Sequence, residues 1–542
     1  MRLPPAEAVC TLVSMPDWDE NLNLRSFDLE FNVVWEEASH ANESWVFDRL
    51  HYPRPQPPLT QHIHARFMTH GFGVPTIFVN GYSFMRDYGP PPTTQEVEAR
   101  GPVDIWQRDF KPRVQAECLK LRSGDYDSVS APELVASLEA ILTEATKVYR
   151  NTTNVIFAFM RPTSVLIQFC EAESGDEGAG LAARLLQGYG NATSAAGFGL
   201  SELTELAERL PAAAAALKAG NHDLEAVEGG AEFLPRLRSY LDEFGWRAEG
   251  WNLEHIPTWA EDPSLVLDLI GRYLSDPERS PAAALRRSEA EREAAKRELE
   301  LKLDPSKLSR FRELAAAAID HVAISEERAL WQLQMVGSVR VPYVALGRKL
   351  AAAGVIDVAN DIFYLTWDEV LAAANDVSKR HQGDVEARKA ELAAQEKLLP
   401  PTFIGVAPSM SRAPSDLAAV MRHLRGYGVE PSTDASVING MGASRGVARG
   451  RARIIVNLSD SERLSTGDIL ICRTTSPPWT PLFSIAGGVV TDAGGILSHS
   501  AICAREYGIP CVVGTQVATQ QVPEGAMIEI DGTKGSVTIL QA

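Results

Sequence analysis

One stretch near the C-terminus, TDAGGILSHSAICAREYGIPCVVGT (Thr491 to Thr515), constrains this chain more than any other. An extended, β-branched run, GGVVT, leads into the pair Gly494 and Gly495, which favours a tight turn. Ser498 then stands at the N-cap position of a helix that we expect from about His499 to Tyr507. The stretch therefore predicts a strand, a turn and a helix, with a histidine as the first helical residue.

A histidine in this position is suited to carrying a phosphoryl group. The unsatisfied amides and the positive dipole end of a helix N-terminus stabilise negative charge, and glycines let the backbone approach a phosphate closely. We expect His499 to react as a neutral imidazole and Thr491, Gly494, Gly495 and Ser498 to hold the phosphate. A lone histidine in such a turn is also compatible with a purely structural role.

The surrounding residues favour the phosphate carrier. The stretch resembles the phosphohistidine signature of the mobile, or swivelling, domain of phosphoenolpyruvate-utilising enzymes, a group that includes pyruvate phosphate dikinase, rifampicin phosphotransferase and phenylphosphate synthase. INGMGASRGVARGRARII and TTSPPWTPLFSIAGGVVTD upstream resemble the opening of the same domain and the lead-in to its histidine. The resemblance implies a compact β/β/α domain with His499 as the phosphohistidine.

The rest of the chain predicts a multidomain α+β protein, in which a largely α-helical region precedes this domain. We expect an irregular mixed entry region over 1–115, a helical substrate-binding and linker domain over 116–395, a connector over 396–434 and the swivelling domain over 435–542. Leu134, Leu138, Leu142 and Ala145 fall on one helical face. SPAAALRRSEAEREAAKRELELKL predicts a solvated helix, and RFRELAAAAIDHVAISEERALWQLQMVGSV and VPYVALGRKLAAAG predict two further helices.

Three segments of the helical region, HYPRPQPPLT, EHIPTWAEDP and NDIFYLTWDEV, resemble the rifampicin phosphotransferase and phenylphosphate synthase branch. In that family an ATP-grasp domain splits ATP and donates the phosphoryl group to the histidine. Only about fifty residues precede HYPRPQPPLT, fewer than an ordinary domain of ~100 to 200 residues needs. We therefore expect a separate ATP-grasp partner subunit that binds ATP and Mg²⁺, and no metal in the fold of this chain.

The resemblance implies that the acceptor is a small, mostly apolar alcohol or phenol bound by the helical region. Transfer to its hydroxyl needs a base for the proton and cations for the phosphoryl oxygens. The candidates are Glu327, Arg328 and Arg340, in the helical segment where the rifampicin phosphotransferase branch places charged catalytic residues, and in addition His321. Each also fits a surface or ion-paired role.

Two other functions remain compatible with the sequence. The chain could be a phosphorylated carrier or regulator without acceptor chemistry, although a carrier needs only the last hundred residues. It could also be a component of a pyruvate or phosphoenolpyruvate phosphotransferase, although no run of alternating strands and helices predicts a pyruvate-binding barrel of ~250 residues.

The net charge and the composition limit the kinds of partner and the cellular compartment that we expect. A formal net charge of -19 repels nucleic acid, and no stretch reaches the ~18 to 20 apolar residues of a membrane span. The N-terminal residues lack the pattern of a signal peptide, so we expect a cytoplasmic protein. Six cysteines without a CxxC pair fit a reducing compartment and argue against a zinc site.

Overall fold

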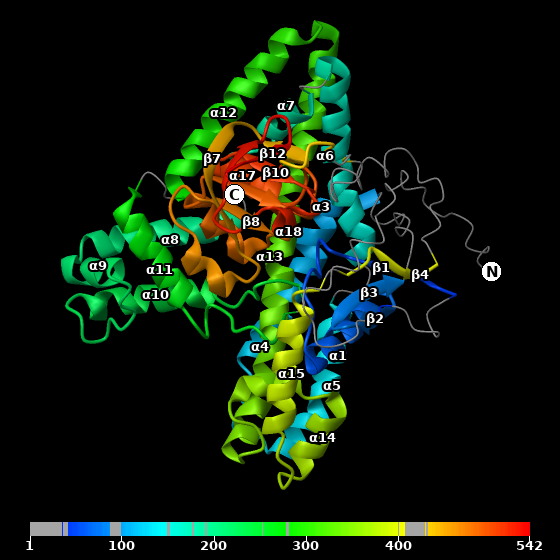
Figure 1. The fold of residues 1–542 in the computed structure, drawn as a ribbon, viewed down its shortest axis with the longest axis vertical. Helices are drawn as coiled ribbons and strands as arrows, with labels where there is room; N and C mark the ends of the chain where they lie inside the picture. The colour runs from blue at the N-terminus through cyan, green and yellow to red at the C-terminus, as the bar shows by residue number, and fades with distance from the viewer. Residues whose placement is uncertain are drawn as a thin grey trace. The chain divides into compact units, whose positions relative to one another are not determined.

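The computed structural model describes residues 35, 42–86, 99–148, 152–175, 178–189, 192–251, 253–277, 281–398, 400–406, 429 and 432–541. Two compact units emerge (Figure 1), one formed by 1–157, 250–257 and 331–413 and the other by 158–249, 258–330 and 414–542. Each unit thus combines segments that are distant in the sequence. Much of the expected connector, including 407–428, lies outside the described residues.

The first unit contains a four-stranded antiparallel sheet and a set of helices. The strands are β1 (Ser44–Phe47), β2 (Thr76–Val79), β3 (Tyr82–Arg86) and β4 (Phe403–Gly405), in the spatial order β2-β3-β1-β4. The helices are α1 (Pro58–Arg66), η2 (Phe67–Phe72), α3 (Pro102–Ile105), η3 (Trp106–Phe110), α4 (Lys111–Arg122), α5 (Ala131–Lys147), η7 (Ala359–Tyr364), α14 (Trp367–Asn375) and α15 (Gln382–Gln395). A buried aliphatic and aromatic core joins α1, α4, α5 and α14.

Helix α5 has the face that the sequence predicts. Leu134, Leu138, Leu142 and Ala145 are all buried in the core of the first unit. The Ser130 amide and hydroxyl both donate to the Glu133 carboxylate, which closes the first turn of the helix.

The helices of the second unit pack around the C-terminal sheet. They are α6 (Thr152–Ser174), which begins in the first unit, α7 (Gly178–Leu185), α8 (Ala192–Glu208), α9 (Pro211–Lys218), α10 (Gly230–Phe244), α11 (Ser264–Ser275) and α12 (Pro281–Lys302), followed by the short η6 (Pro305–Lys307). One continuous apolar core includes leucines of α8 and α11 together with residues of the sheet and of its helices.

Helix α13 (Leu308–Ala352) is a single helix of 45 residues, so the prediction of two separate helices was wrong. Pro342 lies inside it and removes one backbone donor. The helix nevertheless continues, because Val339, Tyr343 and Leu346 around the proline are fully buried in the core of the first unit. Residues up to Leu330 belong instead to the second unit.

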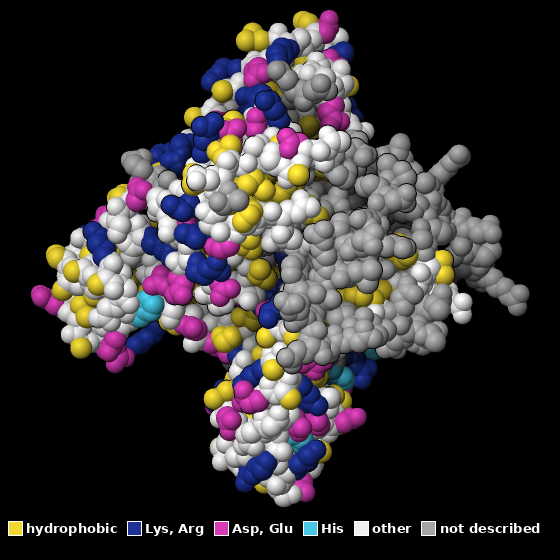
Figure 2. Space-filling view, viewed as in Figure 1, with side chains coloured by type: hydrophobic (Ala, Val, Ile, Leu, Met, Phe, Trp, Pro, Cys, Tyr) yellow, Lys and Arg dark blue, Asp and Glu magenta, His cyan; other side chains and the backbone are white. Residues whose placement is uncertain are grey.

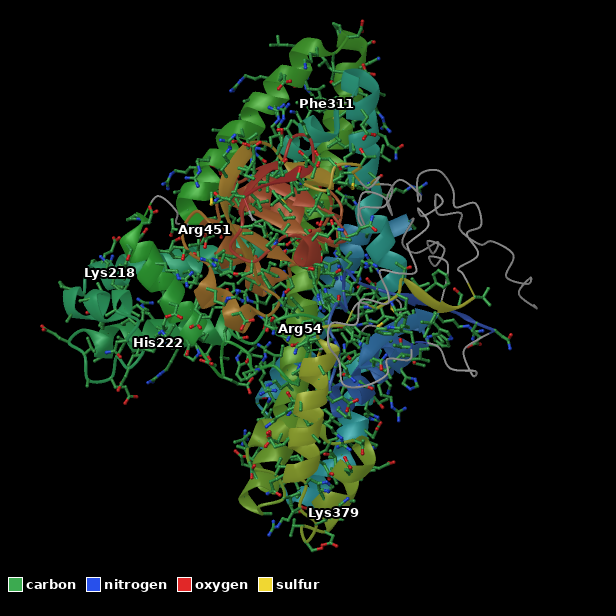
Figure 3. The ribbon with its side chains drawn as sticks, in the orientation of Figure 1. Arg54, Lys218, His222, Phe311, Lys379 and Arg451 are labelled. Atoms are coloured by element: carbon green, nitrogen blue, oxygen red, sulfur yellow. The ribbon has the colours of Figure 1, made fainter. Side chains whose placement is uncertain are left out.

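The segment SPAAALRRSEAEREAAKRELELKL forms a helix as predicted, but the helix is solvated on one side only. One side of α12 is buried, with Ala295 and Leu299 wholly inaccessible to solvent. They share a cluster with Phe311 of α13, which Figure 3 labels and whose ring stacks at 6.4 Å on that of Phe169 in α6. The opposite side carries the charged residues, and Figure 2 shows basic and acidic side chains interspersed over the helices.

The C-terminal residues form an eight-stranded mixed sheet in the order β5-β12-β11-β7-β8-β9-β10-β6. The strands are β5 (Val437–Asn439), β6 (Met441–Ser444), β7 (Val447–Ile454), β8 (Ile469–Cys472), β9 (Gly488–Thr491), β10 (Cys511–Val513), β11 (Met527–Asp531) and β12 (Ser536–Gln541). Strands β7, β8, β9 and β10 run parallel to one another and the others pair antiparallel. The predicted α+β class and the β-rich C-terminal domain are confirmed.

Candidate phosphohistidine site

His499 is the first residue of α17 (His499–Tyr507), the helix that the sequence predicts with the same bounds. Ser498 is its N-cap, and its side-chain oxygen accepts a hydrogen bond from the Ala501 amide at 3.5 Å. Gly508 ends the helix in the left-handed conformation, with φ of 66°. The strand, turn and helix therefore place an imidazole beside unsatisfied helix amides.

The residues predicted to hold phosphate surround the turn before this helix. Gly494 has φ of 105°, which an L side chain rarely adopts, and the Ser498 amide donates to the Gly495 carbonyl at 2.9 Å. The Thr491 hydroxyl donates to the carbonyl of Ala493 at 2.8 Å. These groups shape the turn, and their contact with a phosphate stays a prediction.

Three side chains contact the imidazole of His499. Nε2 lies 3.2 Å from the Thr480 hydroxyl and 3.3 Å from the Cys503 sulfur. Nδ1 lies 3.3 Å from Oε2 of Glu326, which is buried on α13. Thr480 belongs to the helical turn η9 (Pro477–Ser484), whereas Cys503 is one turn further along α17. The imidazole is thus enclosed by two helices and the loop that precedes β9.

These contacts distinguish the two ring nitrogens. A carboxylate only accepts hydrogen bonds, so Glu326 selects the tautomer that carries its proton on Nδ1. Nε2 then holds the lone pair, and the Thr480 hydroxyl donates to it. In the neutral state Nε2 is therefore the nucleophilic nitrogen.

The contacts of His499 in this arrangement oppose the expected neutral imidazole. Burial alone lowers the pKa of His499, but the Cys503 sulfur and the Glu326 carboxylate outweigh it and raise the pKa to about 10. The contact with Glu326, which is remote in sequence, thus favours the protonated imidazole.

The residues that contact His499, namely Thr480, Cys503 and Glu326, are not the acceptor-side residues predicted from the sequence. Glu327 and Arg328 are half-buried on α13. Successive residues of a helix are rotated by ~100° about its axis, so these two side chains project in other directions than that of Glu326. The His321 Nδ1 hydrogen-bonds the Ala317 carbonyl of its own helix. Catalytic roles for these three residues stay predictions.

Arg340 has a clear structural role in the first unit. It is buried, and its Nη1 donates to the Glu254 carbonyl at 2.5 Å and to Oδ1 of Asn360 at 2.7 Å. The Asn360 amide in turn donates to the His255 carbonyl at 2.8 Å. Arg340 thus joins two of the segments singled out in the sequence, EHIPTWAEDP and NDIFYLTWDEV.

Sequence reasoning missed Glu326, Thr480 and Cys503. Cys503 could have been found, because residues i and i+4 lie on the same helical face. Glu326 and Thr480 are 173 and 19 residues away from His499. Only the tertiary fold distinguishes Glu326 from its neighbour Glu327.

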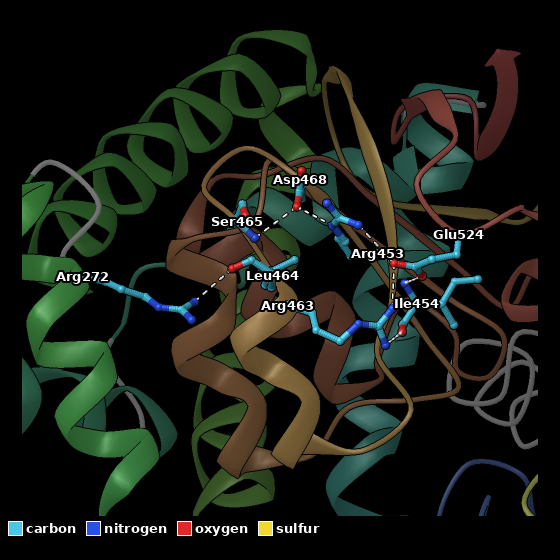
Figure 4. A network of polar contacts seen from close by, with 8 residues as sticks. All are labelled: Arg272, Arg453, Ile454, Arg463, Leu464, Ser465, Asp468 and Glu524. Atoms are coloured by element: carbon cyan, nitrogen blue, oxygen red, sulfur yellow. Dashed lines mark hydrogen bonds and ion pairs between the residues drawn. The ribbon is translucent and has the colours of Figure 1, made fainter. Parts of the chain in front are cut away.

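Polar contacts also fasten the histidine domain to the helices of the same unit. The Gly188 amide donates to the Glu506 carboxylate at 3.0 Å, and the Ser288 hydroxyl donates to the Arg505 carbonyl at 2.8 Å. Arg272 of α11 donates to the Leu464 carbonyl at 3.1 Å (Figure 4). Burial raises the pKa of Glu506 to about 7, so part of this attachment titrates near neutrality.

A second network lies within the histidine domain. Arg453 bridges Asp468 at 2.9 Å and Glu524 at 3.2 Å, and Arg463 pairs with the same Glu524 at 2.7 Å (Figure 4). These pairs connect β7 to the loops before β8 and β11.

One cluster in the first unit has the residue types of a metal site. Side-chain ligand atoms of Glu369, His381 and Asp384 lie within 4.8 Å of one another. Arg388 already pairs with both oxygens of Glu369 and, by its hydrogen bonds, lowers the pKa of that carboxyl to about 2. The charge of the Glu369 carboxylate is thus balanced by Arg388, and the cluster does not require a metal ion.

Two known family models match the segments of the chain that contain His499 and Glu326. Residues 464–535 match the mobile domain of PEP-utilising enzymes, and residues 151–326 match the fourth domain of rifampicin phosphotransferase. The chain belongs to the phosphoenolpyruvate-utilising enzyme family. His499 lies within the first match and Glu326 is the last residue of the second.

The chain is similar to two rifampicin phosphotransferases. It is 31% identical to the one from Streptomyces sviceus, over 79% of this chain and 49% of that protein, and 33% identical to the one from Bacillus subtilis, over 58% and 36%. It is also 29% identical to part of chondramide synthase from Chondromyces crocatus, over 94% of this chain and 14% of that protein. The chain thus spans half or less of the length of these relatives. Among the described helices, none has the length and apolar character to cross a bilayer.

Proposed function

We propose that this chain is the phosphohistidine and acceptor-binding component of an ATP-dependent phosphotransferase. His499 takes a phosphoryl group that originates from ATP on a separate ATP-grasp partner, and passes it to the hydroxyl of a small, mostly apolar alcohol or phenol. AMP and phosphate are the other products. The observation that carries this proposal is the imidazole at the start of α17, with Nε2 facing a hydroxyl donor and Nδ1 facing a carboxylate.

In the first step, the Nε2 lone pair attacks the β-phosphorus of ATP, an N–P bond forms and the bond from that phosphorus to the oxygen of AMP breaks, which leaves a pyrophosphoryl group on the imidazole. Water then attacks the γ-phosphorus and the bond from the γ-phosphorus to the β–γ bridging oxygen breaks, which releases phosphate and leaves the β-phosphoryl group on Nε2. Mg²⁺ at the ATP site of the partner neutralises the phosphate oxygens. Because Glu326 favours the cationic imidazole, we expect this step to take place when His499 has left Glu326. The swivelling motion of the domain would provide that separation.

In the second step, contact with Glu326 favours donation of the phosphoryl group. A proton on Nδ1, held by the Glu326 carboxylate, makes the imidazole a better leaving group. The acceptor oxygen attacks phosphorus, the N–P bond breaks and the hydroxyl proton passes to a base, for which Glu327 and His321 are the candidates from the sequence. We therefore assign the contact between His499 and Glu326 to the acceptor side of the proposed cycle.

The acceptor class rests on the relatives and on the resemblance of the helical region. Two relatives are named as phosphotransferases of rifampicin. We assign binding of the acceptor to the helical region, whose segments resemble the same branch of the family. We place the complex in the cytoplasm, where ATP is available.

Transfer of label from ATP tests this function. This chain, an ATP-grasp protein of the pyruvate phosphate dikinase type and β-labelled ATP are combined, first without and then with a panel of alcohols and phenols. We expect acid-labile, base-stable label on this chain, which then moves to one acceptor class. Label that stays on the chain with every acceptor supports a carrier or regulator, and transfer only to pyruvate supports a pyruvate-type component.

A further inference from the structure

A buried cationic cluster lies in the second unit, away from His499. Arg247 follows α10 and is only 1% exposed, which makes it the largest of the fully buried side chains of the described residues. Two buried tyrosines approach it: Tyr240 of α10 and Tyr507, the last residue of α17. The cluster therefore includes residues from the helical part and from the histidine domain.

Several polar atoms of this cluster are poorly satisfied. Within the described part of the chain, the nitrogens of Arg247 and the hydroxyls of Tyr240 and Tyr507 form no hydrogen bond of good geometry, and Tyr240 is the side chain that most strongly offsets the burial of Arg247. A buried guanidinium without a hydrogen-bonded counter-charge is strongly unfavourable, because it loses its hydration. Water or a bound ligand must therefore supply acceptors for the remaining donors.

The chemistry of the cluster defines that group. All nitrogens of a guanidinium are donors, and the two hydroxyls can donate as well. Burial lowers the pKa of Arg247 and raises those of Tyr240 and Tyr507, and the groups that oppose the shift of Arg247 are the two tyrosines. No carboxylate is among them. The cluster thus has an excess of donors and requires a ligand rich in acceptors.

The contact with Trp259 leaves the donors of Arg247 available. The guanidinium carbon lies 4.3 Å from the centre of the Trp259 ring, a cation–π contact that needs none of the N–H groups. A guanidinium can bind a phosphate or a carboxylate through two of its N–H groups.

We propose that Arg247, Tyr240 and Tyr507 form a binding site for a small tetrahedral oxyanion, of which inorganic phosphate is the representative. This site is separate from the phosphoryl group on His499, because Tyr507 is eight residues further along α17, ~12 Å at 1.5 Å per residue. His499, Cys503 and Tyr507 share one face of the helix at a spacing of four residues.

Because of the position of this site, a bound anion would affect how the histidine domain packs against the helices of the same unit. Arg247 and Tyr240 belong to the helical part of the unit, whereas Tyr507 belongs to the domain that carries His499. An anion that bonds to all three is bound best when the two parts are in contact. By linkage, it then stabilises the arrangement in which His499 contacts Glu326.

Anion binding to the full chain tests the proposal without any turnover, so its outcome is independent of the proposed function. Thermal unfolding and calorimetric titration are measured with inorganic phosphate at constant ionic strength, with sulfate and acetate as parallel arms. We expect saturable stabilisation by phosphate and sulfate and little by acetate, which has only two oxygens. If acetate alone stabilised the chain, the site would bind a carboxylate and the assignment to a tetrahedral oxyanion would be overturned.

Variants locate the binding. Tyr507→Phe and Tyr240→Phe each remove one hydroxyl, and we expect each to weaken phosphate binding about fivefold to tenfold. Arg247→Met should abolish it. Arg272→Met is the matched control, because Arg272 also links the helices to the histidine domain but through the Leu464 carbonyl; it should retain the phosphate response.

The alternative is that water molecules fill the cluster. In that case no saturable phosphate response appears in the unmodified chain, or the response persists unchanged in Tyr507→Phe and Tyr240→Phe. Either result overturns the proposal, and it does so even if Arg247→Met fails to fold.

Discussion

Nδ1 of His499 lies 3.3 Å from Oε2 of Glu326, although the two residues are 173 positions apart in the sequence. One belongs to the first turn of α17 and the other to the middle of α13. The contact gives the imidazole a preferred tautomer, a raised pKa and a nucleophilic Nε2. Most of the following predictions depend on it.

Glu326→Gln should separate the two half-reactions. The neutral amide holds the Nδ1 proton of the phosphorylated imidazole less firmly than the carboxylate does, so the imidazole becomes a poorer leaving group. We expect transfer from His499 to the acceptor to slow by about 10²- to 10⁴-fold, the range of general acid–base contributions. Single-turnover kinetics from the phosphorylated chain measure this step.

Glu313→Gln is the matched control, since it changes an exposed carboxylate on the same helix. We expect its transfer rate to be close to that of the unmodified chain. Equal losses in the two variants would contradict the assignment to Glu326.

The ion pair of His499 and Glu326 should also make the free energy of unfolding depend on pH. The pKa of His499 is raised from 6.5 to about 10, so the ion pair stabilises the fold fully below about pH 6.5 and is lost as the pH rises through 10. The free energy of unfolding of Glu326→Gln should therefore fall furthest below that of the unmodified chain near pH 6. Denaturant unfolding at a series of pH values checks this, and a difference that grows toward pH 10 would refute it.

Thr480→Val removes the hydroxyl that donates to Nε2 and preserves the shape of the side chain. A hydrogen bond of this kind contributes ~1 kcal/mol, so we expect a roughly fivefold change in the rate at which His499 is phosphorylated. Thr475→Val is the control, because the Thr475 hydroxyl bonds Ser500 at 2.8 Å instead. The rate of label incorporation from ATP distinguishes the two variants.

Glu254→Gln should change the pH dependence of the first unit. Burial raises the pKa of Glu254 from 4.5 to about 8, while Arg340 opposes the shift. The folded state thus disfavours the ionised carboxylate, and stability falls as the pH rises from 4.5 through 8. The variant should lack this component, which denaturant unfolding between pH 5 and 9 measures; Glu144→Gln, at an exposed position on α5, should retain it.

The sequence predicts those parts of the site that depend on local signals. Ser498, the paired glycines and Gly508 define α17 to the residue, and the β-branched runs locate the strands of the C-terminal sheet. These signals act within a few residues, as caps, turns and strand periodicity do.

Features that depend on distant packing were missed. Pro342 predicts a break in a helix, but buried neighbours on either side keep α13 continuous. Local reasoning likewise cannot choose between Glu326 and Glu327, because only the docking of α17 decides which carboxylate meets the histidine. The protonation state of His499 follows from the same contact.

Mass spectrometry of this chain during turnover tests the central claim most directly. The chain is incubated with an ATP-grasp partner, ATP and Mg²⁺, stopped in base and analysed by fragmentation. The account predicts a phosphoryl group on Nε2 of His499 that forms and decays at the rate of turnover, and none in His499→Ala. A working complex in which His499 always stays unmodified, or label that persists in His499→Ala, would contradict it.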